Sequence, residues 1–313
     1  MGGTPLLPAV GLGTAPLGGL YARVSPAAAA AAVAEAVEIG YRYFDTAPLY
    51  GYGAAERALG RGLEGCGAQM AVSTKVGRII DEIAPRPAGD MFAGSSGATM
   101  WDFSADGVRR SLEASLKRLG RSYIDVVFIH DPDRHARQAL DEAYPALERL
   151  RDEGVIGAVG VGMNEPKLPT QFVTDTDIDA VLIAGRYTLL DRSADRALFN
   201  AAMARGVHVI AAGVYNSGIL AAVETNPHFD YAVASAEIVS RARQLQAACD
   251  DFGVPLAAAA VQFVVRHPAV GTVLLGARSQ AEAAENWSHT HAGLPDDLWT
   301  ALDEIIKGAD DVD

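Results

Sequence analysis

Short apolar segments alternate with helical patterns along the whole chain, and this alternation constrains the fold more than any other feature. Eight apolar segments are found: Val10–Gly13, Tyr43–Ala47, Ala71–Val76, Ile124–His130, Val155–Val161, Ala180–Ala184, Val207–Ala212 and Thr272–Gly276. Such runs are typical of parallel strands buried on both faces. Between them, apolar residues recur every three or four positions, as in the stretch from Val108 to Leu119 that Gly120 ends. Strand and helix alternating eight times predict an α/β protein of the (β/α)8 TIM barrel class.

The alternative architecture is a doubly wound open sheet, which requires a glycine-rich fingerprint directly after the first strand. The stretch Gly11-Leu12-Gly13-Thr14-Ala15-Pro16 has proline in place of the third glycine, and Leu17-Gly18-Gly19 leads into a loop. We interpret it as a barrel strand and a turn. Because no linker or shift of composition divides the chain, residues 1–313 are predicted to form a single domain.

Composition limits the partners of the protein. The 26 Lys and Arg residues face 39 Asp and Glu residues, a formal net charge of −13, which argues against binding nucleic acid or an anionic membrane. The N-terminus shows no signal-peptide pattern, and no apolar run reaches membrane-spanning length, so we expect a cytoplasmic protein. Cys66 and Cys249 form no spacing motif, and no metal site is predicted.

Two segments between strands are unusually long. Gly77–Ser104 is rich in Pro, Gly and Ser and carries several aromatic residues, and Gly213–Ser235 contains two tyrosines and a phenylalanine. Loops that follow barrel strands lie at the C-terminal face, where barrel enzymes build their active sites. These segments therefore predict a substrate lid.

Polar side chains stand at the predicted C-terminal ends of three neighbouring strands. They are Asp45, Lys75 and His130, and Tyr50 follows Asp45 in the loop. Taken singly, Asp45 suits a turn and His130 a structural hydrogen bond. Lys75 is harder to explain alone, because an ammonium in an apolar strand needs a carboxylate partner.

Together these residues suit the interconversion of a carbonyl and an alcohol. A tyrosine has a pKa near 10, and a neighbouring ammonium favours the phenolate and so lowers that pKa. A carboxylate holds the ammonium, and a neutral imidazole donates a hydrogen bond to the substrate oxygen. A nicotinamide would exchange the hydride.

The chain resembles the aldo-keto reductase family in motifs that cover nearly its whole length. They are Asp45-Thr46-Ala47 with Tyr50-Gly51, Ser73-Thr74-Lys75-Val76, the strand that ends in His130, Gly160-Val161-Gly162-Met163-Asn164, and Gly276-Ala277-Arg278 with Glu285-Asn286. By this resemblance Tyr50 is the general acid/base, Lys75 and Asp45 tune it, and His130 orients the substrate.

The resemblance also implies a nicotinamide cofactor that lies extended across the barrel mouth. Asn164 would bind the carboxamide, and the Asn216-Ser217-Gly218 turn the pyrophosphate. The adenosine end would meet residues of the last motif, namely Gly276, Arg278, Glu282, Glu285 and Asn286.

Several positions depart from the family pattern. Ala184 and Ala212 stand where many members have a Gln and a Tyr against the nicotinamide. Gly276 and Glu282 replace a Lys and an Arg of many NADPH-using members, and a carboxylate near the ribose disfavours a 2′-phosphate. Arg278 is a possible phosphate partner, and Glu282 has an alternative role as a solvated helix residue. We expect NAD as cofactor, with NADP as the alternative.

A narrower resemblance concerns the small-molecule substrate. The stretches from Ala184 to Leu190, Trp101 to Ser104 and His130 to Asp133 are similar to D-threo-aldose 1-dehydrogenases, which include enzymes that oxidise L-fucose, and to pyridoxal 4-dehydrogenases. The implied reaction removes a hydride from C1 of a cyclic aldose and gives a lactone. Arg186 and Trp101 would bind the sugar.

Alternatives remain for these assignments. Arg186 is also explained as an ion-pair partner of Asp191 or Asp131, and Trp101 as an anchor of the lid. The same barrel also suits pyridoxal, or the NADPH-dependent reduction of aldehydes and ketones. A non-enzymatic alternative is a regulatory barrel that senses the cofactor.

Overall fold

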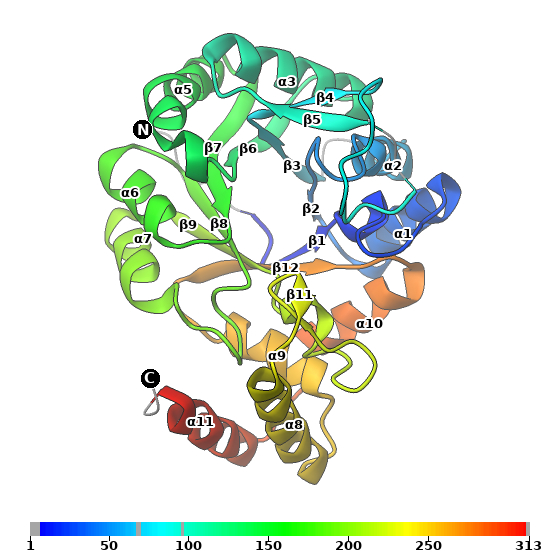
Figure 1. Ribbon diagram of the computed structural model, residues 1–313, viewed down its shortest axis with the longest axis vertical. Coiled ribbons are helices and arrows are strands. Elements are labelled where there is room, and N and C mark those ends of the chain that lie inside the picture. The colour runs from blue at the N-terminus through cyan, green and yellow to red at the C-terminus, as the bar shows by residue number, and fades with distance from the viewer. Residues whose placement is uncertain (1–6, 67–69, 95–96, 311–313) are drawn as a thin grey trace.

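The computed structural model describes residues 7–66, 70–94 and 97–310, and its centre is a closed parallel barrel (Figure 1). The strands neighbour one another in the order β1-β12-β9-β8-β7-β6-β3-β2. Their bounds are β1 Val10–Gly13, β2 Tyr43–Asp45, β3 Ala71–Val76, β6 Ile124–His130, β7 Ile156–Met163, β8 Ala180–Ala184, β9 His208–Ala212 and β12 Val270–Gly276. The predicted TIM barrel is confirmed. Residues 1–6, 67–69, 95–96 and 311–313 of the predicted domain lie outside the described residues.

The strand boundaries agree with the sequence prediction within two residues. The largest differences are at β2, which ends at Asp45 rather than Ala47, at β7, which continues to Met163, and at β12, which begins at Val270 rather than Thr272. The β7 extension is paired on both sides, since Gly162 pairs with His130 of β6 and Met163 with Ile183 of β8. Pairing partners therefore decide these ends, and the apolar run alone does not reveal them.

The interior of the barrel is filled by side chains that alternate along the strands. They are Tyr43, Val126, Phe128, Ala158, Ala180, Leu182, Ile210 and Leu274, with Leu7 packed against them. Phe128 takes space that a side chain on β7 would need, because a Cβ at Gly160 would lie 2.6 Å from its ring. The barrel is thus a packed core below the site, with no open pore.

Helices surround the barrel and cover the outer faces of its strands (Figure 1). They are α1 Pro26–Ile39, α2 Ala54–Gly62, α3 Ala105–Leu119, α4 Ala136–Gln138, α5 Tyr144–Asp152, α6 Lys167–Asp175, α7 Asn200–Arg205, α8 Ala236–Asp251, α9 Leu256–Val265, α10 Gln280–Thr290 and α11 Asp296–Asp310. Helix α3 ends at Gly120 as predicted, with a left-handed backbone at φ 64°. Its first turn is capped by Ser104, whose side chain accepts a hydrogen bond from the backbone N–H of Gly107.

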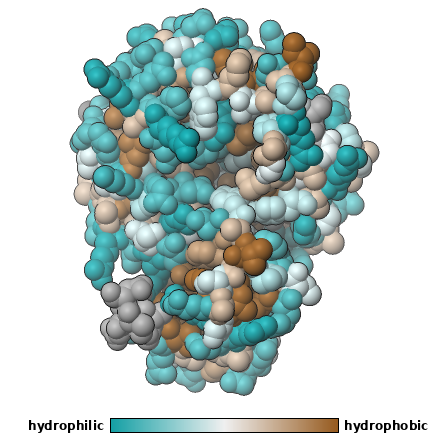
Figure 2. All heavy atoms as spheres, viewed as in Figure 1, coloured by the Kyte–Doolittle hydropathy of each residue, from teal (hydrophilic) through white to brown (hydrophobic). Residues whose placement is uncertain are grey.

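Both long segments follow barrel strands and carry hairpins. The first contains β4 Arg78–Asp81 paired antiparallel with β5 Ala98–Trp101, and it lies along α3 (Figure 1). The second contains the turn Asn216–Gly218 and then the short hairpin of β10 His228–Phe229 and β11 Ala232–Val233. Because β3 and β9 precede them, both segments leave the barrel at its C-terminal face. That face is mostly hydrophilic and is hollowed near its centre (Figure 2).

No single helix among the described residues is both long and apolar enough to cross a membrane. Only α8 and α9 together, which meet at a bend of 98°, have the length and composition of a broken span.

Candidate active site

The structure brings Asp45 and Lys75 together at the ends of the adjacent strands β2 and β3. The Lys75 Nζ atom donates hydrogen bonds to Oδ1 and Oδ2 of Asp45 at 2.7 and 2.6 Å, and both side chains are 2% exposed. Lys75 also donates to the carbonyl of Thr46 at 2.9 Å, and Ser73 donates to Asp45 Oδ1 at 2.7 Å. The ammonium therefore has a partner for each of its three protons, which fixes its position.

Tyr50 lies beside this ion pair in the loop after β2. Its ring centroid is 5.0 Å from Lys75 Nζ, and its ring meets that of His130 edge-on at 6.0 Å. The backbone of Gly18 packs directly on that of Tyr50, since a Cβ at Gly18 would lie 2.7 Å from the Tyr50 carbonyl carbon. The loop thus holds the phenol against the ends of β3 and β6.

The protein environment raises the pKa of Tyr50 well above 10. Burial is the largest cause, followed by the charge of Asp45, while Arg78 acts in the opposite direction. The surroundings as a whole therefore act in the direction opposite to the lowering expected from the ammonium alone. The physical reason is that burial and the nearby Asp45 carboxylate both disfavour the phenolate.

His130 is the last residue of β6 and is buried. Burial lowers its pKa well below 6.5, and the charges of Arg78 and Lys75 lower it further. The imidazole is therefore neutral at pH 7. Its Nε2 atom lies 3.4 Å from Asp131 Oδ2. Its Nδ1 atom is buried and has no hydrogen-bond partner in the part of the chain that the structure describes.

A cavity begins at Tyr50 and Asp45 and runs across the mouth of the barrel. Small residues at the ends of β8, β9 and β12 line it: Ala184, Gly185, Ala212, Gly213 and Gly276. Ala184 and Ala212, two of the departures from the family pattern, therefore leave open space where larger side chains would stand. Asn216, Ser217 and Tyr231 line the same cavity. Its path from the tyrosine to Gly276 suits an elongated ligand.

The turn predicted to meet a pyrophosphate has an unusual backbone. Asn216 and Ser217 both have positive φ values, 44° and 57°, and Gly218 has φ 103°. Asn216 Nδ2 donates to the Gly185 carbonyl at 3.2 Å, whereas Asn216 Oδ1 is buried and has no hydrogen-bond partner among the described residues. A buried acceptor beside a cavity is what a bound polar group would satisfy, so these residues fit a nicotinamide dinucleotide.

Asn164, predicted to bind a carboxamide, follows the end of β7. Its side chain lies near the phenol of Tyr231 from the β10–β11 segment and lowers the pKa of that phenol, against the larger effect of burial. Tyr231 is held in turn by its backbone N–H, which donates to Ser217 Oγ at 2.9 Å. The second long segment thus reaches across the cavity to β7, which sequence reasoning did not reveal.

At the far end of the cavity, Glu282 is bonded to Arg278. Its carboxylate accepts from the backbone N–H of Arg278 at 2.8 Å and from the Arg278 side chain at 3.2 Å. The two side chains are 37% and 47% exposed. Asn286 is buried and connects Gly276 to Tyr215, whereas Glu285 is exposed on α10. The charges of Glu282 and Arg278 thus offset each other at a position that is open to solvent.

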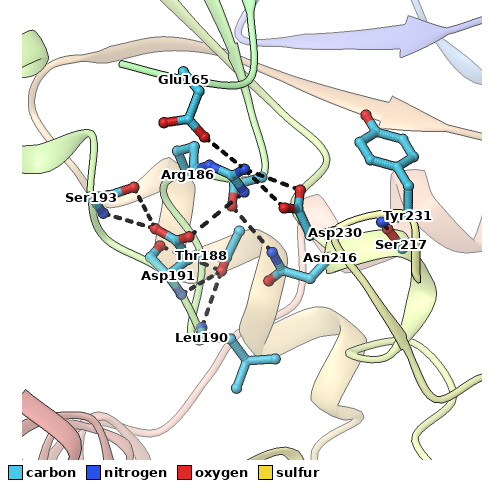
Figure 3. A network of polar contacts seen from close by, with 11 residues as sticks. Glu165, Arg186, Thr188, Leu190, Asp191, Ser193, Asn216, Ser217, Asp230 and Tyr231 are labelled. Carbon is cyan, nitrogen blue, oxygen red and sulfur yellow. Dashed lines mark hydrogen bonds and ion pairs between the residues drawn. The ribbon is translucent and has the colours of Figure 1, made fainter. Parts of the chain in front are cut away.

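Arg186 lies in a network of carboxylates at the edge of the cavity (Figure 3). It contacts Glu165 at 3.2 Å, Asp230 at 3.1 Å and Asp191 at 3.7 Å. Asp191 is one of the two ion-pair partners considered from the sequence. The other, Asp131, is not a partner of Arg186, because it is bonded to Arg78 instead.

Trp101 lies in β5 and is 43% exposed. Its ring stacks on Phe103 at 5.7 Å, and the guanidinium of Arg78 lies 3.7 Å from its centroid. This supports a role as an anchor within the first long segment. Sequence reasoning missed Arg78, although its position directly after β3 was a signal. Among the described residues, no group of three or more His, Cys, Asp or Glu is placed to hold a metal ion.

A barrel with a lysine–carboxylate pair, a tyrosine and a histidine at its strand ends defines an oxidoreductase that works with a nicotinamide. The Aldo/keto reductase family matches residues 9–307, and the chain belongs to this family.

Individual relatives are similar over most of the chain. Pyridoxal 4-dehydrogenase of Microbacterium luteolum is 41% identical, over 94% of this chain and 92% of the relative. D-threo-aldose 1-dehydrogenase of a Pseudomonas species is 36% identical, over 95% of this chain and 94% of the relative. An aldo-keto reductase from Bacillus halodurans, solved in its holo form, superposes with a TM-score of 0.76 at 24% identity and covers 95% of this chain and 91% of its own. The chain is thus an NAD(P)-dependent oxidoreductase of a small molecule.

Proposed function

We propose that this enzyme oxidises C1 of a cyclic aldose and releases a lactone. The observation that carries the proposal is the buried Asp45–Lys75 pair against the ring of Tyr50, with the neutral imidazole of His130 beside it. The similarity to a D-threo-aldose 1-dehydrogenase supports the substrate class.

In this mechanism, Tyr50 and His130 hold the anomeric hydroxyl between them. The neutral His130 donates a hydrogen bond to the hydroxyl oxygen, and Tyr50, as phenolate, takes the hydroxyl proton. As the O–H bond breaks, the oxygen forms the carbonyl bond of the lactone. The bound nicotinamide supplies the acceptor for the hydride that leaves C1. Lys75 stabilises the phenolate, and Asp45 holds Lys75 in place.

We further propose the residues that would hold the cofactor. Asn164 would hold the nicotinamide end, the Asn216-Ser217-Gly218 turn the middle, and Gly276, Arg278, Glu282, Glu285 and Asn286 the adenosine end. Asn216, Ser217 and Gly276 of this set line the cavity. The unpaired Asn216 Oδ1 would accept a hydrogen bond from a cofactor hydroxyl or amide. Arg186 is a weaker candidate for binding sugar, since its guanidinium already faces three carboxylates.

A second candidate substrate is pyridoxal, favoured by the 41% identity to a pyridoxal 4-dehydrogenase. Membership of an oxidoreductase family favours an enzyme over a regulatory barrel. An initial-rate screen separates the candidates, using L-fucose and other aldoses, pyridoxal and simple aldehydes, each with NAD and NADP in both directions. We expect the fastest turnover with an aldose, with lactone detected as product. Turnover of pyridoxal alone would favour the second candidate.

The cofactor gives a separate prediction. We expect kcat/KM to favour NAD over NADP by about fivefold, because an exposed carboxylate repels a 2′-phosphate only weakly. Glu282→Arg is expected to narrow or reverse this preference, since it replaces the repulsion by a guanidinium that binds phosphate. Steady-state kinetics with both cofactors at one ionic strength measure the ratio.

The matched control is Glu304→Arg, which makes the same charge change at an exposed position of α11. This control should leave the ratio unchanged. If wild type prefers NADP, or Glu282→Arg leaves the ratio as it was, Arg278 rather than Glu282 decides the preference.

A further inference from the structure

A partly buried ion pair, Arg78–Asp131, lies beside the proposed catalytic residues and has no role in the chemistry described so far. Asp131 directly follows His130, and its backbone has φ 45°, which is uncommon for a residue with a side chain. Its backbone N–H donates to the carbonyl of Gly162 at 3.0 Å. Strained conformations of this kind persist where the surroundings enforce them, and they gather at functional sites.

Arg78 holds the Asp131 carboxylate from the side of the first long segment. Its Nη2 atom lies 2.9 Å from Asp131 Oδ2, and its guanidinium is stacked on Trp101. The Arg78 side chain is 16% exposed, and Asp131 takes one hydrogen bond from its Nη2 atom. Because a guanidinium has five N–H donors, the pair combines a fixed acceptor with a donor group that has further N–H bonds, and a hydroxyl group can use both.

The position of the pair relative to the reacting atoms is set by His130. The same Nε2 atom that faces Asp131 Oδ2 at 3.4 Å is the donor we assign to the reacting oxygen. Oxygens on adjacent carbons of a sugar ring lie within hydrogen-bond reach of each other. An oxygen on the carbon next to the reacting one can therefore reach Asp131 while the first stays on His130 and Tyr50.

We propose that Asp131 and Arg78 bind the hydroxyl on the carbon next to the reacting carbon, so that the enzyme selects hemiacetals with a free hydroxyl there. The Asp131 carboxylate accepts a hydrogen bond from the hydroxyl group, and Arg78 donates a hydrogen bond to the hydroxyl oxygen. This assignment rests on the proposed function and specifies its substrate class further. It also gives Trp101 a part in selectivity, since Trp101 holds the Arg78 guanidinium in place.

The test compares L-fucose with 2-deoxy-L-fucose, which lacks only the hydroxyl in question. We expect wild-type kcat/KM to be about thirtyfold lower for the 2-deoxy sugar, the effect of one hydrogen bond to a charged group. Asp131→Asn should lower kcat/KM for L-fucose by a similar factor and change that for the 2-deoxy sugar little. Asparagine tolerates the left-handed backbone, so the variant is expected to fold.

Two further variants serve as a control and as a second test of the proposed contact. Asp133→Asn removes the same charge from an exposed position two residues away and should retain the thirtyfold ratio. Arg78→Met removes the donor and should reduce the ratio of kcat/KM for L-fucose over 2-deoxy-L-fucose to about threefold. This measurement tests the inference even if Asp131→Asn is unstable.

The outcomes separate this inference from the proposed function. If wild type oxidises both sugars equally well, or if Asp131→Asn lowers both values by the same factor, Asp131 only positions His130 and the inference is overturned. An Arg78→Met variant with the wild-type ratio overturns it as well. If wild type oxidises no aldose, the proposed function fails and the inference fails with it.

Discussion

Tyr50→Phe is expected to lower kcat by about a hundredfold or more, because it deletes the group that takes the proton while keeping the ring in place. The affinity for the cofactor should change little, since the phenol oxygen contributes nothing to the proposed cofactor contacts. The ring packing on Phe92 at 6.0 Å and on His130 at 6.0 Å stays available to phenylalanine. The loss should therefore concern the chemical step rather than the fold.

Three measurements distinguish this loss from a structural defect. They are steady-state kinetics, titration of the cofactor by protein fluorescence, and the melting temperature. The matched control is Tyr52→Phe, which removes a phenol oxygen two residues away, where the side chain is buried near Asp90 rather than in the cavity. Near wild-type turnover by Tyr50→Phe would show that another group moves the proton.

The barrel could be predicted from the sequence because the patterns that mark its strands and its helices are both local in the chain. Apolar runs such as Ile124–His130 identify buried strands by themselves, and helices such as α3 carry their own cap in Ser104 and their own end in Gly120. In a parallel barrel all strands end at the same face. The residues at the ends of β2, β3 and β6 are therefore neighbours in space once the fold is known, although 85 positions separate Asp45 from His130 in the chain.

The pairing of charges around the cavity could not be predicted in the same way. Arg186 meets Asp230, 44 residues further along, only because the second long segment folds back over the cavity. Arg78 meets Asp131 across 53 residues for a similar reason, as the β4–β5 hairpin folds beside β6. Such contacts depend on how loops pack, and neither hydrophobic periodicity nor motif spacing records that.

The pKa of Tyr50 shows a second limit of prediction from the sequence. The residue types alone suggest that a lysine lowers the pKa of the tyrosine, yet the protein environment raises it, because burial and the Asp45 charge outweigh the effect of the Arg78 guanidinium. The direction of the pKa shift depends on distances and on solvent exposure, which a sequence does not contain.

Oxidation needs the phenolate of Tyr50, and the pKa of Tyr50 is raised. The rate of oxidation should therefore rise with pH through the alkaline range.

Lys75→Met is expected to have two effects, one on stability and one on the pH profile. The first arises because Asp45, 2% exposed, keeps the hydroxyl of Ser73 but loses its cation. Breaking a buried ion pair from one side destabilises a protein by about 3–5 kcal/mol, which a denaturant titration at pH 7 would measure. The second arises because the cation 5.0 Å from the Tyr50 ring is lost, which disfavours the phenolate. The alkaline limb of kcat/KM for oxidation should move to higher pH by about one unit.

The double variant Asp45→Asn with Lys75→Met separates these effects. Because it leaves no buried charge unpaired, it should be more stable than Lys75→Met alone. Its alkaline limb should also shift less, since the Asp45 charge that raises the pKa of Tyr50 is removed together with the cation. Lys117→Met, which removes an exposed lysine from α3, should change neither property. An unshifted alkaline limb of the pH profile in Lys75→Met would mean that Lys75 supports the fold of the site without tuning Tyr50. Equal shifts of this limb in the single and double variants would mean that Asp45 has no electrostatic effect on Tyr50.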